Sequence, residues 1–395
     1  MNEPTNPFHP GVTAPPDRFV GRRLVMRTIE DELLLKTYPM PVISVVGQRR
    51  IGKTSLLRKL DETLGSREDM RFLFLDCLAL RGASPAKFLN ELVTRLDPSG
   101  RPTQDPEDPE DPWEQLAKAL ETGEGRVVFL LDELDALAGS SGPRYDGEFF
   151  SNFRSFLAGH ADRLTIIAAT ARPLDSSAWA EGNDVGSPFY NLPAKTEIIG
   201  FLEEDAAWTL LGAGSNFLNM DERSFLLELA GLHPHFLHIA GSAAWTAKHR
   251  VGDDFRQQVR EIFQRDARLT YREVTKNVPE KLFDELVVRV LFGTRGNVQT
   301  TGDLRAALLC GPDGRVYSQG LASYLVSDRS KVAETLTRIL GGLYQRFRED
   351  LLKAAREEAT LDESAKLYLY SKGLLKDDMQ LSEQAKAWIM TTDLE

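Results

Sequence analysis

The segment from Pro41 to Leu57 constrains the fold of this chain more than any other stretch of the sequence. A short β-branched run, Val42–Val46, leads into the pattern Gly-x-x-x-x-Gly-Lys-Thr at Gly47–Thr54, and a stretch with the apolar periodicity of a helix follows. A phosphate-binding loop requires this order, because the N–H groups of a Gly-rich turn and of a helix N-terminus must close around a polyphosphate. The segment therefore predicts a buried strand, a P-loop and a helix that together bind a nucleotide.

Two side chains of this loop add chemistry to that of the backbone. Lys53 is placed to reach the β- and γ-phosphates, and the Thr54 hydroxyl is placed to ligate Mg²⁺. Arg49 and Arg50 contact phosphate, contact a neighbouring subunit or are simply solvated, and the sequence leaves these interpretations open. The other loop residues expected against the nucleotide are Gly47, Arg50, Ile51, Gly52 and Ser55.

The composition indicates a multi-domain protein without a membrane segment. With 395 residues, 42% of them hydrophobic, the chain is long enough for two or three domains. No apolar run approaches the ~18 residues of a membrane helix. Residues 1–17 are polar and Pro-rich and lack a signal-peptide pattern, so we expect a flexible tail. Only Cys77 and Cys310 are cysteines, which favours a reducing, cytoplasmic location.

An acidic strand end is the second decisive feature. The apolar run Val127–Leu131 is followed by Asp132 and Glu133. Ligands of open α/β sheets bind at the carboxyl ends of the strands. We expect Asp132 to hold Mg²⁺, directly or through water, and Glu133 to polarise the attacking water. The alternative is a strand that merely ends in an acidic turn, and Asp135 is expected to face solvent or cap a helix.

Further strands and helices are predicted around these two motifs. Arg71–Cys77 and Leu164–Arg172 have the composition of buried strands, and Pro85–Leu96 that of a helix. At the end of the last strand, Thr170 is a candidate for contact with the γ-phosphate or the lytic water, and Arg172 for sensing the γ-phosphate or acting across a subunit interface. Their alternatives are a strand cap and a surface arginine. Residues 97–112, rich in Pro, Asp and Glu, are expected to form a solvated connector.

Together these motifs resemble the P-loop ATPases of the additional-strand class, and among the AAA+ group they are most similar to prokaryotic STAND ATPases, the signal-transduction ATPases with numerous domains. The resemblance implies an α/β fold: a three-layer P-loop core with a parallel sheet, then a helical lid and a winged-helix domain. Leu232, Arg23 and Leu24 depart from the family pattern. The matching segments are Arg18–Arg22 (Arg-Phe-Val-Gly-Arg), Gly47–Leu57, Ser187–Asn191 with Ile199–Ala206, and Ala230–Leu237 (Ala-Gly-Leu-His-Pro-His-Phe-Leu).

The resemblance also assigns roles outside the loop. Phe19 and Val20 would contact the base, and His233 with Pro234 would approach the bound nucleotide from the lid. The same histidine and its neighbours His235 and His238 invite a zinc hypothesis, but their spacing differs from the usual metal-binding pairs and no cysteine is near.

The expected domains are a core at 18–200, a lid at 201–272, and a winged-helix-like domain with an insertion at 273–395. Apolar spacing of three to four residues predicts lid helices at Glu203–Leu211, Asp221–Leu229 and Pro234–Lys248, and further helices at Asp254–Arg268, Lys281–Phe292 and Glu383–Met390. Residues 300–360 resemble nothing that we can place.

Three functions are compatible with this organisation. The first is an ATP-driven switch in bacterial signalling or antiphage defence, which would self-associate in its ATP state and act with a separately encoded effector or sensor protein. The alternative is a DNA-acting AAA+ ATPase similar to origin initiators or transposition regulators, which the net charge of −11 disfavours. The third is a scaffold that hydrolyses nothing, and the Asp132–Glu133 pair speaks against it. We expect no membrane partner, and ATP or ADP with Mg²⁺ as cofactors.

Overall fold

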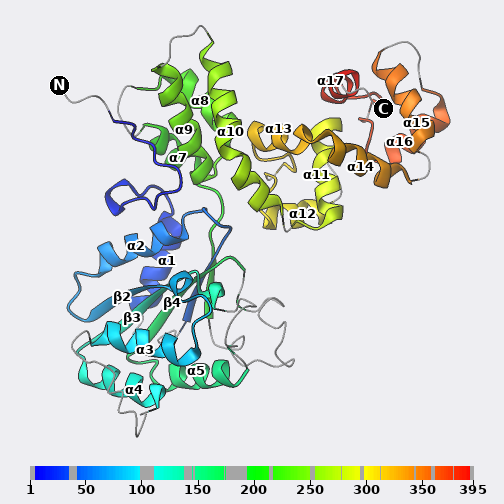
Figure 1. The fold of residues 1–395 in the computed structure, drawn as a ribbon. Helices are drawn as coiled ribbons and strands as arrows, with labels where there is room; N and C mark the ends of the chain where they lie inside the picture. The colour runs from blue at the N-terminus through cyan, green and yellow to red at the C-terminus, as the bar shows by residue number, and fades with distance from the viewer. Residues whose placement is uncertain are drawn as a thin grey trace. The chain divides into compact units, whose positions relative to one another are not determined.

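The computed structural model divides the chain into two compact units, Gly11–Glu203 and Met1–Pro10 with Glu204–Glu395 (Figure 1). The residues that it describes are 5–34, 42–97, 111–137, 145, 147–172, 174, 194–212, 217–249, 254–276, 278–293, 298–311, 313–341, 344–356, 361–376 and 378–391. The boundary at Glu203 falls close to the core–lid boundary expected after residue 200.

A parallel sheet forms the centre of the first unit. Its strand order is β2-β3-β4-β1-β5, and each neighbouring pair is parallel. The strand β4 therefore lies between the P-loop strand β1 and the acidic strand β3. The strands are β1 Val42–Val46, β2 Met70–Asp76, β3 Arg126–Asp132, β4 Leu164–Thr170 and β5 Ala194–Ile198.

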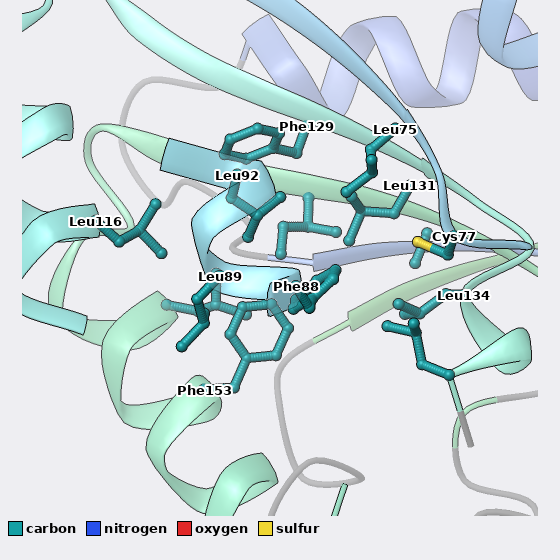
Figure 2. Close-up of a cluster of buried hydrophobic side chains, with 14 of the residues drawn as sticks. Leu75, Cys77, Phe88, Leu89, Leu92, Leu116, Phe129, Leu131, Leu134 and Phe153 are labelled. Atoms are coloured by element: carbon teal, nitrogen blue, oxygen red, sulfur yellow. The ribbon is translucent and has the colours of Figure 1, made fainter. Parts of the chain in front are cut away.

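Helices cover both faces of this sheet, which confirms the predicted three-layer α/β core. On one side lie α1 (Arg23–Leu34) and α2 (Lys53–Leu64), and on the other α3 (Pro85–Leu96), α4 (Pro112–Thr122) and α5 (Gly147–Gly159) (Figure 1). Alternate residues of β3 point to opposite faces. Phe129 and Leu131 pack with Phe88 of α3 and Phe153 of α5 in one buried cluster (Figure 2).

Two strands differ from the sequence predictions. We expected β2 to be buried, but it is an edge strand whose middle residues are partly exposed. We did not predict β5, because Ala-Lys-Thr-Glu-Ile has no apolar run and its pairing with β1 is set by residues far away in the sequence. Most of the predicted connector 97–112 and all of the match at Ser187–Asn191 lie outside the described residues.

From Glu204 onward the described part of the second unit is mainly helical, and it contains helices at all three positions predicted for the lid, although the lid assignment itself stays a prediction. In the first unit, two short 3₁₀ helices, η2 (Cys77–Leu80) and η3 (Leu134–Ala136), follow the carboxyl ends of β2 and β3. The helices of the second unit are α7 Glu204–Gly212, α8 Met220–Ala230, α9 Pro234–Lys248, α10 Phe255–Thr275, α11 Glu280–Phe292, α12 Val298–Ala306, α13 Gln319–Ser327, α14 Arg329–Leu340, α15 Tyr344–Ala355, α16 Glu363–Ser371 and α17 Glu383–Thr391.

Part of residues 300–360, which the sequence could not assign to a known fold, packs on the helices predicted for the lid. At Gly231, between α8 and α9, φ is +65° and an added Cβ would lie 2.6 Å from Cδ2 of Tyr317. Gly320 in α13 has no room for a side chain either, because an added Cβ would lie 2.4 Å from Phe263 of α10. Tyr317 and α13 are therefore part of the lid packing.

A separate buried cluster joins α11 with the last four helices. Between α16 and α17, a tight turn is closed by a hydrogen bond from Lys376 N to the oxygen of Gln380 at 3.0 Å. A winged-helix assignment for this region stays a prediction. No helix among the described residues is long and apolar enough to cross a membrane.

The N-terminal segment differs from the flexible tail that we expected for residues 1–17. Phe8 is 2% exposed and its ring covers Gly241 of α9, where an added Cβ would lie 2.4 Å from Phe8 Cδ1. Asn6 Nδ2 donates to Ser242 Oγ at 3.0 Å, and the His9 N–H donates to Nδ1 of His238 at 3.4 Å. A buried aromatic ring and two hydrogen bonds thus hold a segment whose composition is otherwise that of a tail.

We predict that Phe8 and Gly241 are energetically coupled. Phe8→Ala should destabilise the helical unit by roughly 3 kcal/mol, because it removes a buried ring. Gly241→Ala should be similarly costly in the wild type, since the new Cβ displaces the ring. In the Phe8→Ala background the same change should be neutral or stabilising, because Ala is the better helix former. Urea unfolding, together with hydrogen exchange at α9, would measure the free energy of unfolding of the wild type, the two single variants and the double variant. Val12→Ala, at an exposed position, is the control. An equal cost of Gly241→Ala in both backgrounds would contradict the predicted coupling.

We also predict acid sensitivity at the same contact. Burial, with His9 as a second cause, lowers the pKa of His238 to about 4. Its Nδ1 accepts a hydrogen bond, which requires the neutral ring. The unfolded chain binds the proton more tightly, so the stability contribution is complete above pH ~6.5 and is lost as the pH falls towards 4. Wild-type stability should fall more steeply across this window than that of His238→Gln, by about 3 kcal/mol. Parallel pH profiles would refute the assignment.

Candidate functional site

The backbone of the P-loop explains why glycine stands at both ends of the motif. At Gly47 an added Cβ would lie 2.9 Å from the Ile199 carbonyl oxygen and from Cγ2 of Ile51, so only glycine fits the close approach. At Gly52 space is open, but φ is +104°, which side chains disfavour. Arg50 also has a positive φ, of 64°. The loop therefore turns sharply before α2, whose N-terminal N–H groups are available to an anion.

Lys53, the first residue of α2, folds back over the loop. Its Nζ donates to the carbonyl oxygens of Gly47 at 2.8 Å and Gln48 at 3.0 Å. An ammonium group has three donors, so one is left for a phosphate oxygen. Burial lowers the pKa of Lys53, while nearby carboxylates, Asp135 first among them, raise it. The two hydrogen bonds thus fix the position of the Lys53 ammonium group in the absence of a ligand.

Thr54 and Asp132 join the P-loop helix to the acidic strand end. The Thr54 hydroxyl donates to Oδ2 of Asp132 at 2.6 Å. Asp132 is 5% exposed, and its Oδ1 accepts from the Glu133 N–H at 3.1 Å. Burial raises the pKa of Asp132, and the Thr54 hydrogen bond lowers it. A hydroxyl and a carboxylate oxygen in contact are ligands that Mg²⁺ accepts, so the pair fits the expected ion.

Glu133 follows directly after the strand in a left-handed conformation, with φ 48° and ψ 45°. That conformation is uncommon for a residue with a side chain and is often found at functional sites. It ends β3 and leaves Glu133 on the lining of a cavity of about 220 Å³, together with Lys53 and Asp135. The sequence-predicted base thus borders the same space as the predicted phosphate ligand.

The end of β4 adds the third strand to the site. Thr170 is fully buried, and its hydroxyl donates to the Arg172 carbonyl oxygen at 2.7 Å. Asp135 Oδ2 accepts from the Ala171 N–H at 3.3 Å, so Asp135 caps this turn and does not simply face solvent. Thr170 therefore stabilises the strand end, and its contact with the γ-phosphate or the lytic water stays a prediction. Arg172 contributes its backbone to the turn, and a catalytic role for its side chain stays a prediction.

Arg22 is the important residue that the sequence analysis missed. It is 6% exposed and donates to the carbonyl oxygens of Phe201 at 2.8 Å and Ile51 at 3.1 Å. Its backbone N–H donates to Glu203 Oε2 at 3.0 Å. Burial lowers the pKa of Arg22 to about 10, partly opposed by the Glu203 carboxylate. Its presence in the Phe-Val-Gly-Arg match was the available signal.

The other residues predicted to contact the nucleotide are divided between the two units. Phe19 and Val20 are half-buried in the same unit as the loop, where base contact stays a prediction. Ile51 is fully buried, so it can meet a ligand only through its backbone. The Ser55 hydroxyl accepts from the Ala14 N–H at 3.1 Å. His233, fully buried at the start of α9, and Pro234 belong to the helical unit, and their nucleotide contact stays a prediction.

The zinc hypothesis gains no support from the neighbouring histidines. His235 Nε2 lies 3.2 Å from Thr270 Oγ1, and His238 accepts from the backbone of His9. Among the described residues, no group of three His, Cys, Asp or Glu side chains is placed to hold a metal ion.

Comparisons with known proteins agree with this geometry. Residues 39–175 match a family model described as an AAA domain, and this segment contains Lys53, Thr54, Asp132, Glu133 and Thr170. No curated protein matches the chain. Among solved structures, the Walker-type ATPase PABY2304 of Pyrococcus abyssi is similar at a TM-score of 0.55 and 17% identity, over 82% of this chain and 99% of that chain.

Two further solved structures are similar over most of their length. The ORC2 protein of Aeropyrum pernix, in ADPNP–ADP complexes, has a TM-score of 0.48 and 13% identity, over 94% of each chain. Cdc6p from Pyrobaculum aerophilum has a TM-score of 0.47 and 14% identity, over 98% of this chain and 96% of that chain. These two values are too low to support an argument about function. Residues 39–175 therefore resemble an AAA domain, and the chain shares the fold of a Walker-type ATPase, a P-loop α/β core followed by a helical region.

Proposed function

We propose that this protein binds ATP with Mg²⁺ at the P-loop, hydrolyses it, and uses the difference between the ATP and ADP states to change the conformation of its helical unit. The observation that carries the proposal is the contact of Thr54 with Asp132 at 2.6 Å, beside a cavity that both Lys53 and Glu133 line. A phosphate ligand, a pair of metal ligands and a carboxylate base are the groups that phosphoryl transfer to water needs.

Each side chain would have one task. Lys53 would neutralise charge on the β- and γ-phosphates, and Glu133 would orient water and accept its proton as the water attacks the γ-phosphorus. Thr54 and Asp132 would hold Mg²⁺, which when bound neutralises phosphate charge. The buried pocket of Asp132 keeps this carboxylate dry, so its attraction for a cation is stronger than in water.

Two biological roles are candidates for the proposed ATPase. A STAND-type switch in signalling or defence would self-associate with ATP and act on a separately encoded protein. A DNA-acting ATPase would assemble on a duplex. The AAA domain and the shared ATPase fold fit the DNA-acting alternative at least as well as the STAND assignment. One experiment, the measurement of assembly with and without DNA, can therefore distinguish the two roles.

We predict that two substitutions separate hydrolysis from binding. Glu133→Gln should lower ATP hydrolysis at least ~100-fold and change nucleotide affinity by less than about twofold, because the amide keeps the shape and loses the base. Lys53→Ala should abolish binding of ATP and ADP, since it removes the buried cation. Glu124→Gln, exposed at the other end of β3, is the matched control. Undiminished hydrolysis by Glu133→Gln would rule out this base.

We further predict that assembly depends on the nucleotide. Light scattering after size exclusion would compare wild type and Glu133→Gln with ADP and with ATP, each with Mg²⁺, without and then with duplex DNA. Assembly trapped by ATP in Glu133→Gln alone would support the switch. Assembly that requires DNA, with affinity falling steeply as salt rises, would support the DNA-acting ATPase. A mass that is the same in every condition would count against both.

A further inference from the structure

A tight turn that follows β2 and η2 carries an arginine, Arg81, beside the phosphate-binding loop. Ala83 N donates to the Leu80 carbonyl oxygen at 2.9 Å, Arg81 has φ −56° and ψ 123°, and Gly82 has φ +78°. These angles are those of a type II turn with glycine at its third position. Leu80 is 7% exposed and anchors the turn in the core. The backbone of Arg81 is therefore held fixed.

The turn belongs to an element that lies beside the acidic strand end. β2 and β3 pair in parallel with Asp76 opposite Asp132, so the residues that follow each strand are neighbours. Asp76 caps η2 by accepting from the Leu78 N–H at 2.9 Å. η2 packs against η3, and Cys77 and Leu134 lie in the same buried cluster (Figure 2). Arg81 is thus positioned by the same packing that positions Glu133.

The cavity at the site connects these elements. It is lined by Arg81 from the turn, Lys53 and Arg49 from the P-loop, and Glu133 and Asp135 from the β3 end, with Leu78, Ala136 and Ala171 completing the wall. The P-loop and the helix N-terminus surround the β-phosphate, and Lys53 extends to the γ-phosphate. In the ATP complex proposed above, this cavity between Lys53 and Glu133 would hold the terminal phosphate and the attacking water.

We propose that Arg81 binds the terminal phosphate of ATP within the same chain and so distinguishes ATP from ADP. A guanidinium group suits this task, because it stays charged and presents several donors in a plane to phosphate oxygens. An ADP molecule ends before this cavity, so Arg81 would have no phosphate to meet. Since η2 packs against η3, the contact would also fix the turn that carries Glu133. This inference rests on the proposed nucleotide site and extends it.

The test compares triphosphate with diphosphate binding in Arg81→Ala, Arg81→Lys and wild type. Fluorescent ADP and ATPγS are the probes, so the readout does not depend on hydrolysis. Arg81→Ala should weaken ATPγS binding at least tenfold and change ADP binding by less than twofold, with Arg81→Lys in between. Arg67→Ala, whose exposed side chain pairs with Asp69 at 2.8 Å in the same unit, is the matched control.

The outcomes separate this inference from the proposed function. If wild type binds both nucleotides and Arg81→Ala weakens neither, or weakens both equally, Arg81 is a surface arginine and the inference is overturned while the nucleotide site stands. If wild type binds no nucleotide, the proposed function fails and the inference with it. In a hydrolysing wild type, Arg81→Ala should also lower kcat at least tenfold, since a phosphate-bound arginine acts mainly on the transition state. An unchanged kcat would contradict that part of the proposal.

Discussion

The parallel pairing of the strands is the constraint on which the candidate site depends. Every group of the site follows the carboxyl end of a strand, and parallel pairing brings these ends to one edge of the sheet. The register places Val46 opposite Thr170, Asp76 opposite Asp132 and Leu131 opposite Ala168, so the P-loop, the acidic turn and η2 all begin within about one residue of the same level. The hydrogen bond from Thr54 to Asp132 then spans β4, which lies between their strands. A shift of one strand by one residue would remove this contact.

The sequence could predict those parts of the site in which chemistry and local structure coincide in neighbouring residues. The P-loop is one such part, because the φ angle of Gly52, the close approach at Gly47 and the helix N-terminus at Lys53 all lie within seven residues. The acidic strand end is another. Helix periodicity likewise located the lid helices, whose apolar faces follow the 3.6-residue repeat.

What the sequence could not predict depends on contacts between distant residues. β5 is a polar strand that exists because β1 offers it backbone partners. Phe8 is buried only because a glycine in α9 leaves room for its ring, more than 200 residues away. The pairing of β2 with β3 makes Arg81 a candidate phosphate ligand, since an arginine before a glycine is otherwise an ordinary turn residue.

The two points at which the chain leaves the core unit are both tied to the P-loop. After Pro10 the chain enters the core, and the N–H of Ala14 donates to Ser55 of α2. Before Glu204 it leaves again, and Glu203 accepts from Arg22, whose guanidinium binds the carbonyl oxygen of Ile51. Arg22 is buried, so losing one of its acceptors would leave a charge poorly satisfied, which is costly. The P-loop and the helix that follows it are therefore joined by hydrogen bonds to residues close to both chain connections with the helical unit.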